Sequence, residues 1–147
     1  MESLDAGELG AYFALVTAGD LVQRAVATQL SEHGLTPLQF TILARLLDAP
    51  SGLRMRDLAD MLVVSRSGLT YQVTQLERQR LLTREASTED DRGVTAVLTD
   101  AGRARVVETL PGHVGLVREN LLDLLSPTEI EALRESLERV VTKLRAE

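Results

Sequence analysis

The segment from residue 65 to residue 98 constrains the fold most, because its hydrophobic period changes from helical to strand-like. Apolar residues recur at helical spacing after Ser65, which can cap the helix, as far as about Arg80. Two strand-like runs follow at 81–86 and 94–98, and the polar residues between them form the tip of a hairpin. A polar hairpin directly after such a helix predicts a winged helix-turn-helix.

Three helices are expected before this segment. Residues 5–33 have the spacing of one long helix. Thr36 and Gln39 can form a capping box around a proline at the first helical position, so a second helix begins there. A short third helix over residues 55–62 lacks a good cap, because Arg54 stands where Ser, Thr or Asp is favoured. The second and third helices supply the support that a helix-turn-helix needs.

Two helical segments follow the hairpin. One begins at residues 99–100, and Pro111 is expected to bend or interrupt it. The other begins at Ser126 with a second capping box and runs to the C-terminal region. The expected order is four helices, two strands and two helices, with a short extra strand near Gly52.

The terminal helices carry apolar stripes that are too long for one small lobe to cover. A second copy of the chain is the natural cover, and folding back onto the same lobe is the alternative. The expected fold is therefore mainly α, with one domain over residues 1–147. It contains a winged helix-turn-helix lobe at 36–98 (a three-helix core plus a β-hairpin wing) and dimerisation helices at 5–33 and 99–145.

The helix after Ser65 has an outer face of uncharged hydrogen-bonding side chains with one arginine at its far end. Hydroxyl and amide groups can pair with base edges, and a threonine methyl can contact the thymine methyl. An ordinary solvated face would carry Glu and Lys instead, so duplex DNA is one interpretation, and a polar helix without a partner is the other. The residues of this face are Ser67, Thr70, Tyr71, Thr74, Gln75 and Arg78.

The expected hairpin tip carries Arg92 beside several carboxylates. An arginine at the tip of a hairpin next to a reading helix can enter the adjacent minor groove. Asp90 can brace this guanidinium by an ion pair. A solvated arginine without a partner is the alternative.

Charge and composition restrict the remaining functions. The net charge is −6, but residues 51–92 are neutral overall, so the acidic excess lies in the flanks and does not exclude nucleic acid. Cysteine is absent, which excludes disulfides, thiolate metal sites and thiol-based redox sensing. No signal peptide or membrane span is expected, which indicates a cytoplasmic protein.

An enzyme is the first rival interpretation. The only histidines are His33 and His113, and neither stands in a metal-ligand or nucleophile-activating pattern. No glycine-rich phosphate loop follows a strand. We therefore expect no catalytic residues, no metal and no cofactor. The second rival is a winged-helix protein-interaction module that does not bind DNA.

The sequence resembles the MarR-type (multiple antibiotic resistance) regulators over nearly its full length. The most specific feature is the wing pattern, Asp-x-Arg-Gly followed by Leu-Thr-x-x-Gly. The residues that carry the resemblance are Leu58-Ala59, Val64-Ser65-Arg66-Ser67, Leu76-Glu77, Leu81-Leu82-Thr83-Arg84, Asp90-Asp91-Arg92-Gly93-Val94, and Leu98-Thr99 with Gly102.

The resemblance implies a winged-helix homodimer whose terminal helices interlock and which binds a palindromic operator, usually as a repressor. It also implies release by a small, often aromatic or phenolic, effector bound between the dimer region and the DNA lobe. Arg92 is then the wing arginine and Asp90 its partner. The recognition-helix positions are Ser65, Arg66, Ser67, Thr70, Tyr71 and Gln75. Candidate effector-lining residues are Tyr12, Phe13, Phe40 and His113, with core packing as the alternative for the two phenylalanines.

Three positions depart from the family pattern. Tyr71 and Gln75 stand where members often have arginine, so base preference and phosphate contacts are expected to differ. Gly68 lowers helix propensity near the start of the recognition helix but permits close approach to the DNA backbone. Arg80 replaces the glycine that usually ends this helix. A left-handed arginine there costs on the order of 1 kcal/mol, so the sequence leaves open whether Arg80 is left-handed or the cap is rearranged.

Overall fold

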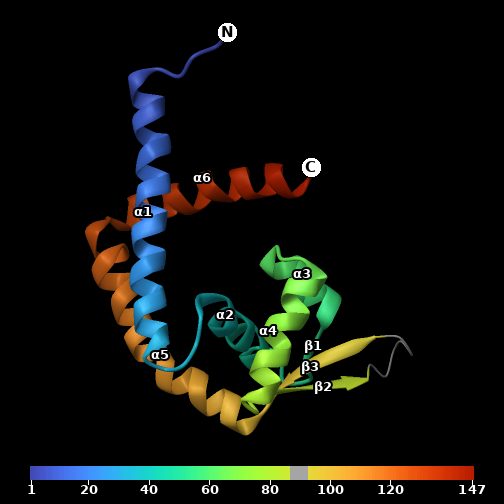
Figure 1. Ribbon diagram of the computed structural model, residues 1–147. Coiled ribbons are helices and arrows are strands. Elements are labelled where there is room, and N and C mark those ends of the chain that lie inside the picture. Colours follow the sequence, from blue (N-terminus) through green and yellow to red (C-terminus); the bar gives the residue numbers. More distant parts are fainter. Residues whose placement is uncertain (87–92) are drawn as a thin grey trace. The chain divides into compact units, whose positions relative to one another are not determined.

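The computed structural model describes residues 1–86 and 93–147 (Figure 1). The expected wing residues Asp90 and Arg92 lie outside the described residues. The elements follow the expected order, including the short extra strand after Gly52. They are α1 (Ala6–Ser31), α2 (Pro37–Leu47), β1 (Leu53–Arg54), α3 (Met55–Leu62), α4 (Arg66–Arg78), β2 (Leu82–Ala86), β3 (Val94–Leu98), α5 (Asp100–Asn120), the 3-10 helix η1 (Leu122–Leu124) and α6 (Pro127–Arg145).

The chain divides into two compact units. One comprises residues 26–113, and the other comprises residues 1–25 together with 114–147. The first unit contains the helix-turn-helix and the sheet. The second contains the N-terminal part of α1, the end of α5, and α6.

The unit of residues 26–113 is built around an aliphatic core. Helices α2, α3 and α4 bury their apolar sides together with the sheet, which has the strand order β1-β3-β2 and is antiparallel throughout. Strand β3 pairs with both others, through Leu53 opposite Ala96 and Leu82 opposite Leu98. The largest fully buried side chains of this core are Leu30, Ile42, Leu43, Leu46, Leu58, Leu69, Val73, Leu76, Leu81, Leu82 and Val106, with Thr109.

The helix starts form as the local sequence predicts. The Thr36 hydroxyl accepts a hydrogen bond from the Gln39 backbone N–H at 3.2 Å, and the Gln39 amide oxygen accepts from the Thr36 N–H at 3.1 Å. Ser126 and Glu129 form the second capping box at the start of α6. Arg54 makes no side-chain capping bond at the start of α3, as expected.

The structure decides two points about helix ends that the sequence left open. Arg80 keeps the left-handed conformation, with φ of 62°, and the cap is not rearranged. Its N–H donates to Glu77 O at 2.9 Å, and Leu81 N–H donates to Leu76 O at 3.0 Å. Leu81 is 2% exposed, so its burial outweighs the strain at Arg80. Helix α5 is not interrupted at Pro111 but continues to Asn120, so the proline lies inside the helix, where it removes one backbone donor.

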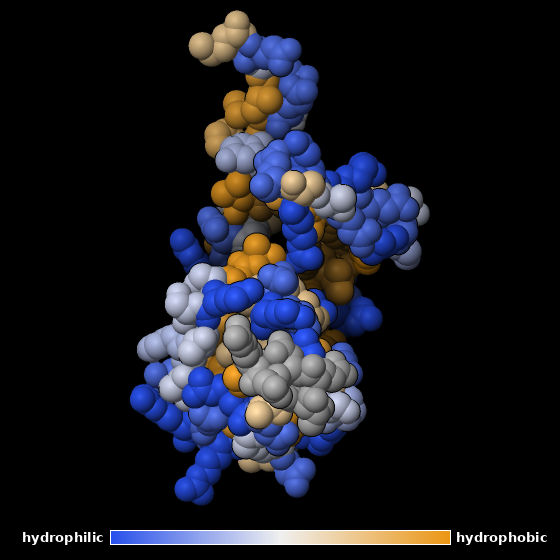
Figure 2. Space-filling model, turned by 90° about the vertical axis from the view of Figure 1, so that its right-hand side faces the viewer, coloured by the Kyte–Doolittle hydropathy of each residue, from blue (hydrophilic) through white to orange (hydrophobic). Residues whose placement is uncertain are grey.

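The unit of residues 1–25 and 114–147 contains no buried residue within the described chain. Figure 2 shows hydrophobic side chains open on its surface, in the upper part of the view. No described helix is long and apolar enough to cross a membrane. The large apolar side chains exposed on α1 and α6 include Leu9, Tyr12, Phe13, Val16, Leu133, Val140, Val141 and Leu144.

Candidate nucleic-acid interface

The start of α4 is fixed by a side-chain cap. Ser65 lies in extended backbone, and its hydroxyl oxygen accepts a hydrogen bond from Gly68 N–H at 3.1 Å. The Ser67 hydroxyl lies 3.4 Å from the same oxygen. A Cβ at position 68 would approach the Ser65 hydroxyl to 3.0 Å, so glycine suits this tight turn. The first turn therefore holds its remaining N–H groups in a defined direction, where a phosphate oxygen can accept from them.

Helix α4 separates a buried side from an open one. Leu69, Val73 and Leu76 are at most 1% exposed and pack into the core. Tyr71 is 61% exposed on the opposite side. The predicted contact residues therefore lie on the open side or its borders: Ser65, Arg66, Ser67, Thr70, Tyr71 and Arg78 are exposed, and Thr74 and Gln75 are half-buried.

The two threonines of this face offer acceptors rather than donors. The Thr70 hydroxyl donates to Arg66 O at 2.8 Å, and the Thr74 hydroxyl donates to Thr70 O at 2.7 Å. Each hydroxyl hydrogen is therefore committed to the helix backbone. The oxygen lone pairs stay available to accept, for example from the amino groups of adenine or cytosine, and the methyl groups suit thymine.

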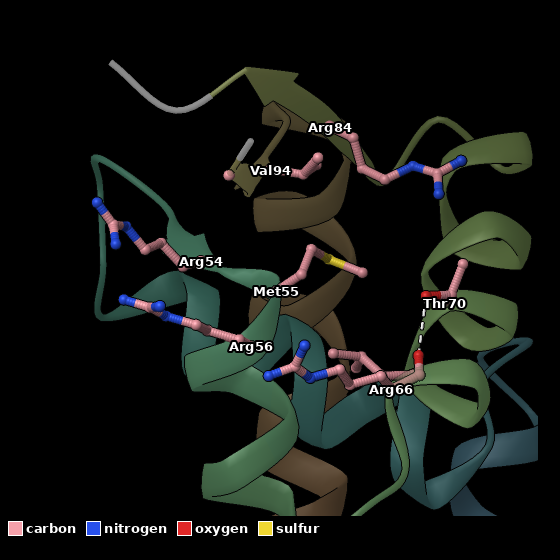
Figure 3. A pocket seen from close by; sticks show the side chains of 9 residues that line it. Arg54, Met55, Arg56, Arg66, Thr70, Arg84 and Val94 are labelled. Carbon is pink, nitrogen blue, oxygen red and sulfur yellow. Dashed lines mark hydrogen bonds between the residues drawn. The ribbon is translucent and has the colours of Figure 1, made fainter. Parts of the chain in front are cut away.

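A cavity of about 460 Å³ opens beside α4. Guanidinium groups from three elements line it: Arg54 on β1, Arg56 on α3 and Arg66 on α4. They gather on one side of it in Figure 3, whereas Arg84 extends toward α4. The remaining lining residues are Met55, Leu69, Thr70, Gly93 and Val94. A cavity with this rim of positive charge suits a phosphate group.

Arg84 holds the base of the hairpin against α4. Its Nη2 lies 2.9 Å from Glu77 Oε1, and its backbone N–H donates to Glu77 Oε2 at 3.2 Å. The side-chain hydrogen bond from Arg84 lowers the pKa of the Glu77 carboxyl. Arg84 therefore joins β2 to α4 and also lines the cavity.

Sequence reasoning missed Arg54, Arg56 and Arg84 as parts of this surface. Arg54 and Arg84 lie on strands that both pair with β3, so the sheet brings them toward α4. The only available signal was the pair of arginines flanking Met55, next to the expected short strand. Arg56 also lies 3.7 Å from Asp57 in a loose, exposed ion pair, which is worth little to stability.

The four candidate effector-lining residues fall in two groups. Phe40 and His113 are in contact, with ring centroids 4.7 Å apart, and Phe40 is 6% exposed. Burial lowers the pKa of His113, and its buried Nδ1 has no hydrogen-bond partner among the described residues. Tyr12 and Phe13 belong to the other unit, where both rings are more than half exposed. Their role in a binding site stays a prediction.

Comparison with known proteins identifies the family. Residues 33–93 match the sequence model of the MarR family. The HTH-type transcriptional regulator MhqR of Bacillus subtilis is 32% identical over 76% of this chain and 75% of its own length. The chain belongs to the MarR family. This finding confirms the resemblance inferred from the wing pattern and places the chain among transcriptional regulators.

Solved structures of MarR family members confirm the winged-helix fold. The chain is similar to AbsC from Streptomyces coelicolor, a MarR family transcriptional regulator, with a TM-score of 0.96 and 31% identity over 100% of both chains. Sco3205 from the same organism was solved in complex with DNA. It matches with a TM-score of 0.94 and 31% identity, over 98% of this chain and 91% of its own.

Proposed function

We propose that this MarR family member is a sequence-specific repressor that binds a palindromic operator in double-stranded DNA as a homodimer in the cytoplasm. The observation that carries the proposal is the open, uncharged hydrogen-bonding face of α4 beside an arginine-lined cavity. The DNA complex of the similar protein Sco3205 supports the same use of this fold.

Helix α4 supplies the base contacts in this proposal. Its polar face enters the major groove, where Thr70, Thr74 and Gln75 meet base edges beside the exposed Tyr71. The first turn, with Ser65, faces the phosphate backbone. Arg66, Ser67 and Arg78 complete the set of proposed contacts.

Arginines supply most of the sequence-independent affinity. A phosphate enters the cavity lined by Arg54, Arg56 and Arg66, each of which can donate two parallel hydrogen bonds. Arg92 reaches the flanking minor groove with Asp90 as its brace. Arg92→Ala is therefore expected to weaken binding to most sequences alike, whereas changes at Ser67 or Tyr71 alter the preferred sequence.

A second copy of the chain covers the apolar sides of α1 and α6. Side chains such as Phe13, which is 56% exposed, and Leu144, which is 64% exposed, would otherwise stay in water. Two copies related by a two-fold axis present two α4 helices to successive major grooves about one helical turn apart, which is why the operator is palindromic.

A small aromatic or phenolic effector is the proposed signal for release. Phe40 and the buried Nδ1 of His113, which has no hydrogen-bond partner among the described residues, are proposed to contact an aromatic ring that carries a hydrogen-bonding group. Tyr12 and Phe13 are the other proposed lining residues. Release requires that the effector bind the DNA-free form more tightly than the DNA-bound form.

The test is selection of bound fragments from random duplex DNA, with and without a panel of phenolic compounds. Affinity for the selected duplex is then measured by fluorescence anisotropy at several salt concentrations. We expect one palindromic sequence to be enriched, and its affinity to fall steeply as salt rises because phosphate contacts displace counterions. Absence of any enriched sequence would favour the protein-interaction module and contradict the proposal.

A further inference from the structure

Gln39 is a buried polar residue that bonds to two elements. It lies in the first turn of α2 and is 8% exposed. Its amide oxygen accepts from Thr36 N–H at 3.1 Å and completes the cap of α2. Its amide nitrogen donates to Gln72 Oε1 on α4 at 3.2 Å. One side chain therefore closes the start of α2 and bonds α2 to the proposed recognition helix.

Gln72 lies at the border between the two sides of α4. The residue before it, Tyr71, is 61% exposed, and the residue after it, Val73, is fully buried. The packed stripe of Leu69, Val73 and Leu76 sets which side of α4 faces the core and limits rotation of the helix about its axis. A hydrogen bond at the border depends on distance and angle and therefore opposes that rotation.

We propose that Gln39 is a positioning residue for DNA reading: through Gln72 it fixes the rotation of α4 about its own axis. This inference rests on the proposed function. A rotation of about 10° moves a side-chain tip on a helix by about 1 Å. Such a shift is enough to misalign hydrogen bonds from Ser67, Tyr71 and Thr74 to base edges. The Gln39–Gln72 bond thus determines how sharply the protein distinguishes sequences, without itself touching DNA.

The principal test is the variant Gln72→Met, which removes the bond and leaves the capping box of α2 intact. Dissociation constants are measured by fluorescence anisotropy for the selected operator, for operators with single base-pair changes, and for a non-cognate duplex. We expect several-fold weaker binding to the operator and unchanged binding to the non-cognate duplex. Discrimination should fall at several base pairs, with the same dependence of affinity on salt, because the phosphate contacts remain.

Two further variants separate positioning from other effects. Gln79→Met makes the same chemical change at an exposed glutamine at the end of the same helix and should leave discrimination unchanged. Gln39→Glu keeps a bond at this place. Its carboxylate can accept from Thr36 N–H and also from the Gln72 side-chain amide, once that amide flips so that its nitrogen faces residue 39. Discrimination should therefore survive in Gln39→Glu.

The outcomes that overturn the inference are distinct. If Gln72→Met lost discrimination at one base pair alone, Gln72 would contact that base directly. An equal loss of affinity for every duplex would indicate general destabilisation of the protein. Unchanged discrimination between sequences would mean that the Gln39–Gln72 bond has no part in reading DNA. If the wild-type chain bound duplexes without preference, the proposed function would fail, and this inference with it.

Discussion

The Glu77 carboxylate accepts two hydrogen bonds from one residue, Arg84: one from Nη2 at 2.9 Å and one from the backbone N–H at 3.2 Å. Glu77 belongs to the last turn of α4, and Arg84 lies in the middle of β2. The pair therefore joins the proposed recognition helix to the base of the hairpin. Because charge-assisted bonds of this kind are directional, the pair limits how far the hairpin can move relative to α4.

Glu77→Gln is expected to weaken operator binding several-fold, mainly by faster dissociation. The amide removes the charge that holds the Arg84 guanidinium, so the hairpin loses part of its anchorage to α4. Dissociation rates measured with labelled operator would show the effect. Glu131→Gln, which removes a carboxylate that also pairs with an arginine but lies on α6, is the matched control. Equal dissociation rates in wild type and Glu77→Gln would contradict this role.

Because of His113, the stability of the fold is expected to depend on pH in mildly acidic solution. Burial lowers its pKa from an ordinary value of 6.5, so the unfolded chain takes up a proton first as the pH falls. Stability is therefore expected to decrease from pH 6.5 down to the lower pKa of the folded state. Urea unfolding midpoints at pH 7.5 and pH 5.5 would measure this loss. His113→Gln should flatten this dependence, and an unchanged slope in that variant would exclude His113 as its source.

Arg80→Gly is expected to stabilise the free protein by up to about 1 kcal/mol. Arg80 has a φ of 62°, where an L-residue with a Cβ is strained and glycine is not. Arg80→Ala keeps the Cβ and removes the charge, so it separates strain from electrostatics. Denaturant unfolding of the wild type and the two variants would measure the free energy of unfolding. We expect the highest value for Arg80→Gly and a value near the wild type for Arg80→Ala. A stabilised Arg80→Ala would instead attribute the effect to charge.

Local patterns in the sequence were sufficient to predict where helices begin. Contacts between residues far apart in the chain could not be predicted in this way. The capping boxes at Thr36 and Ser126 are each formed within four residues, so spacing alone indicates them. The conformation at Arg80 could not be predicted from the sequence because burial of Leu81, a tertiary effect, decides it. The arginine-lined cavity depends on the pairing of Leu53 with Ala96, and the Gln39–Gln72 bond joins residues 33 positions apart. Neither has a local pattern.

Arg66→Ala tests the cavity as a phosphate site. Arg66 begins α4 and lines the cavity beside Arg54 and Arg56. Removing one phosphate contact should weaken binding to cognate and non-cognate duplexes by similar factors and reduce the slope of log affinity against log salt by about 1. Arg45→Ala, at an exposed arginine on α2, should leave the slope unchanged. If Arg66→Ala weakened only the cognate duplex, Arg66 would read a base and the phosphate would bind elsewhere.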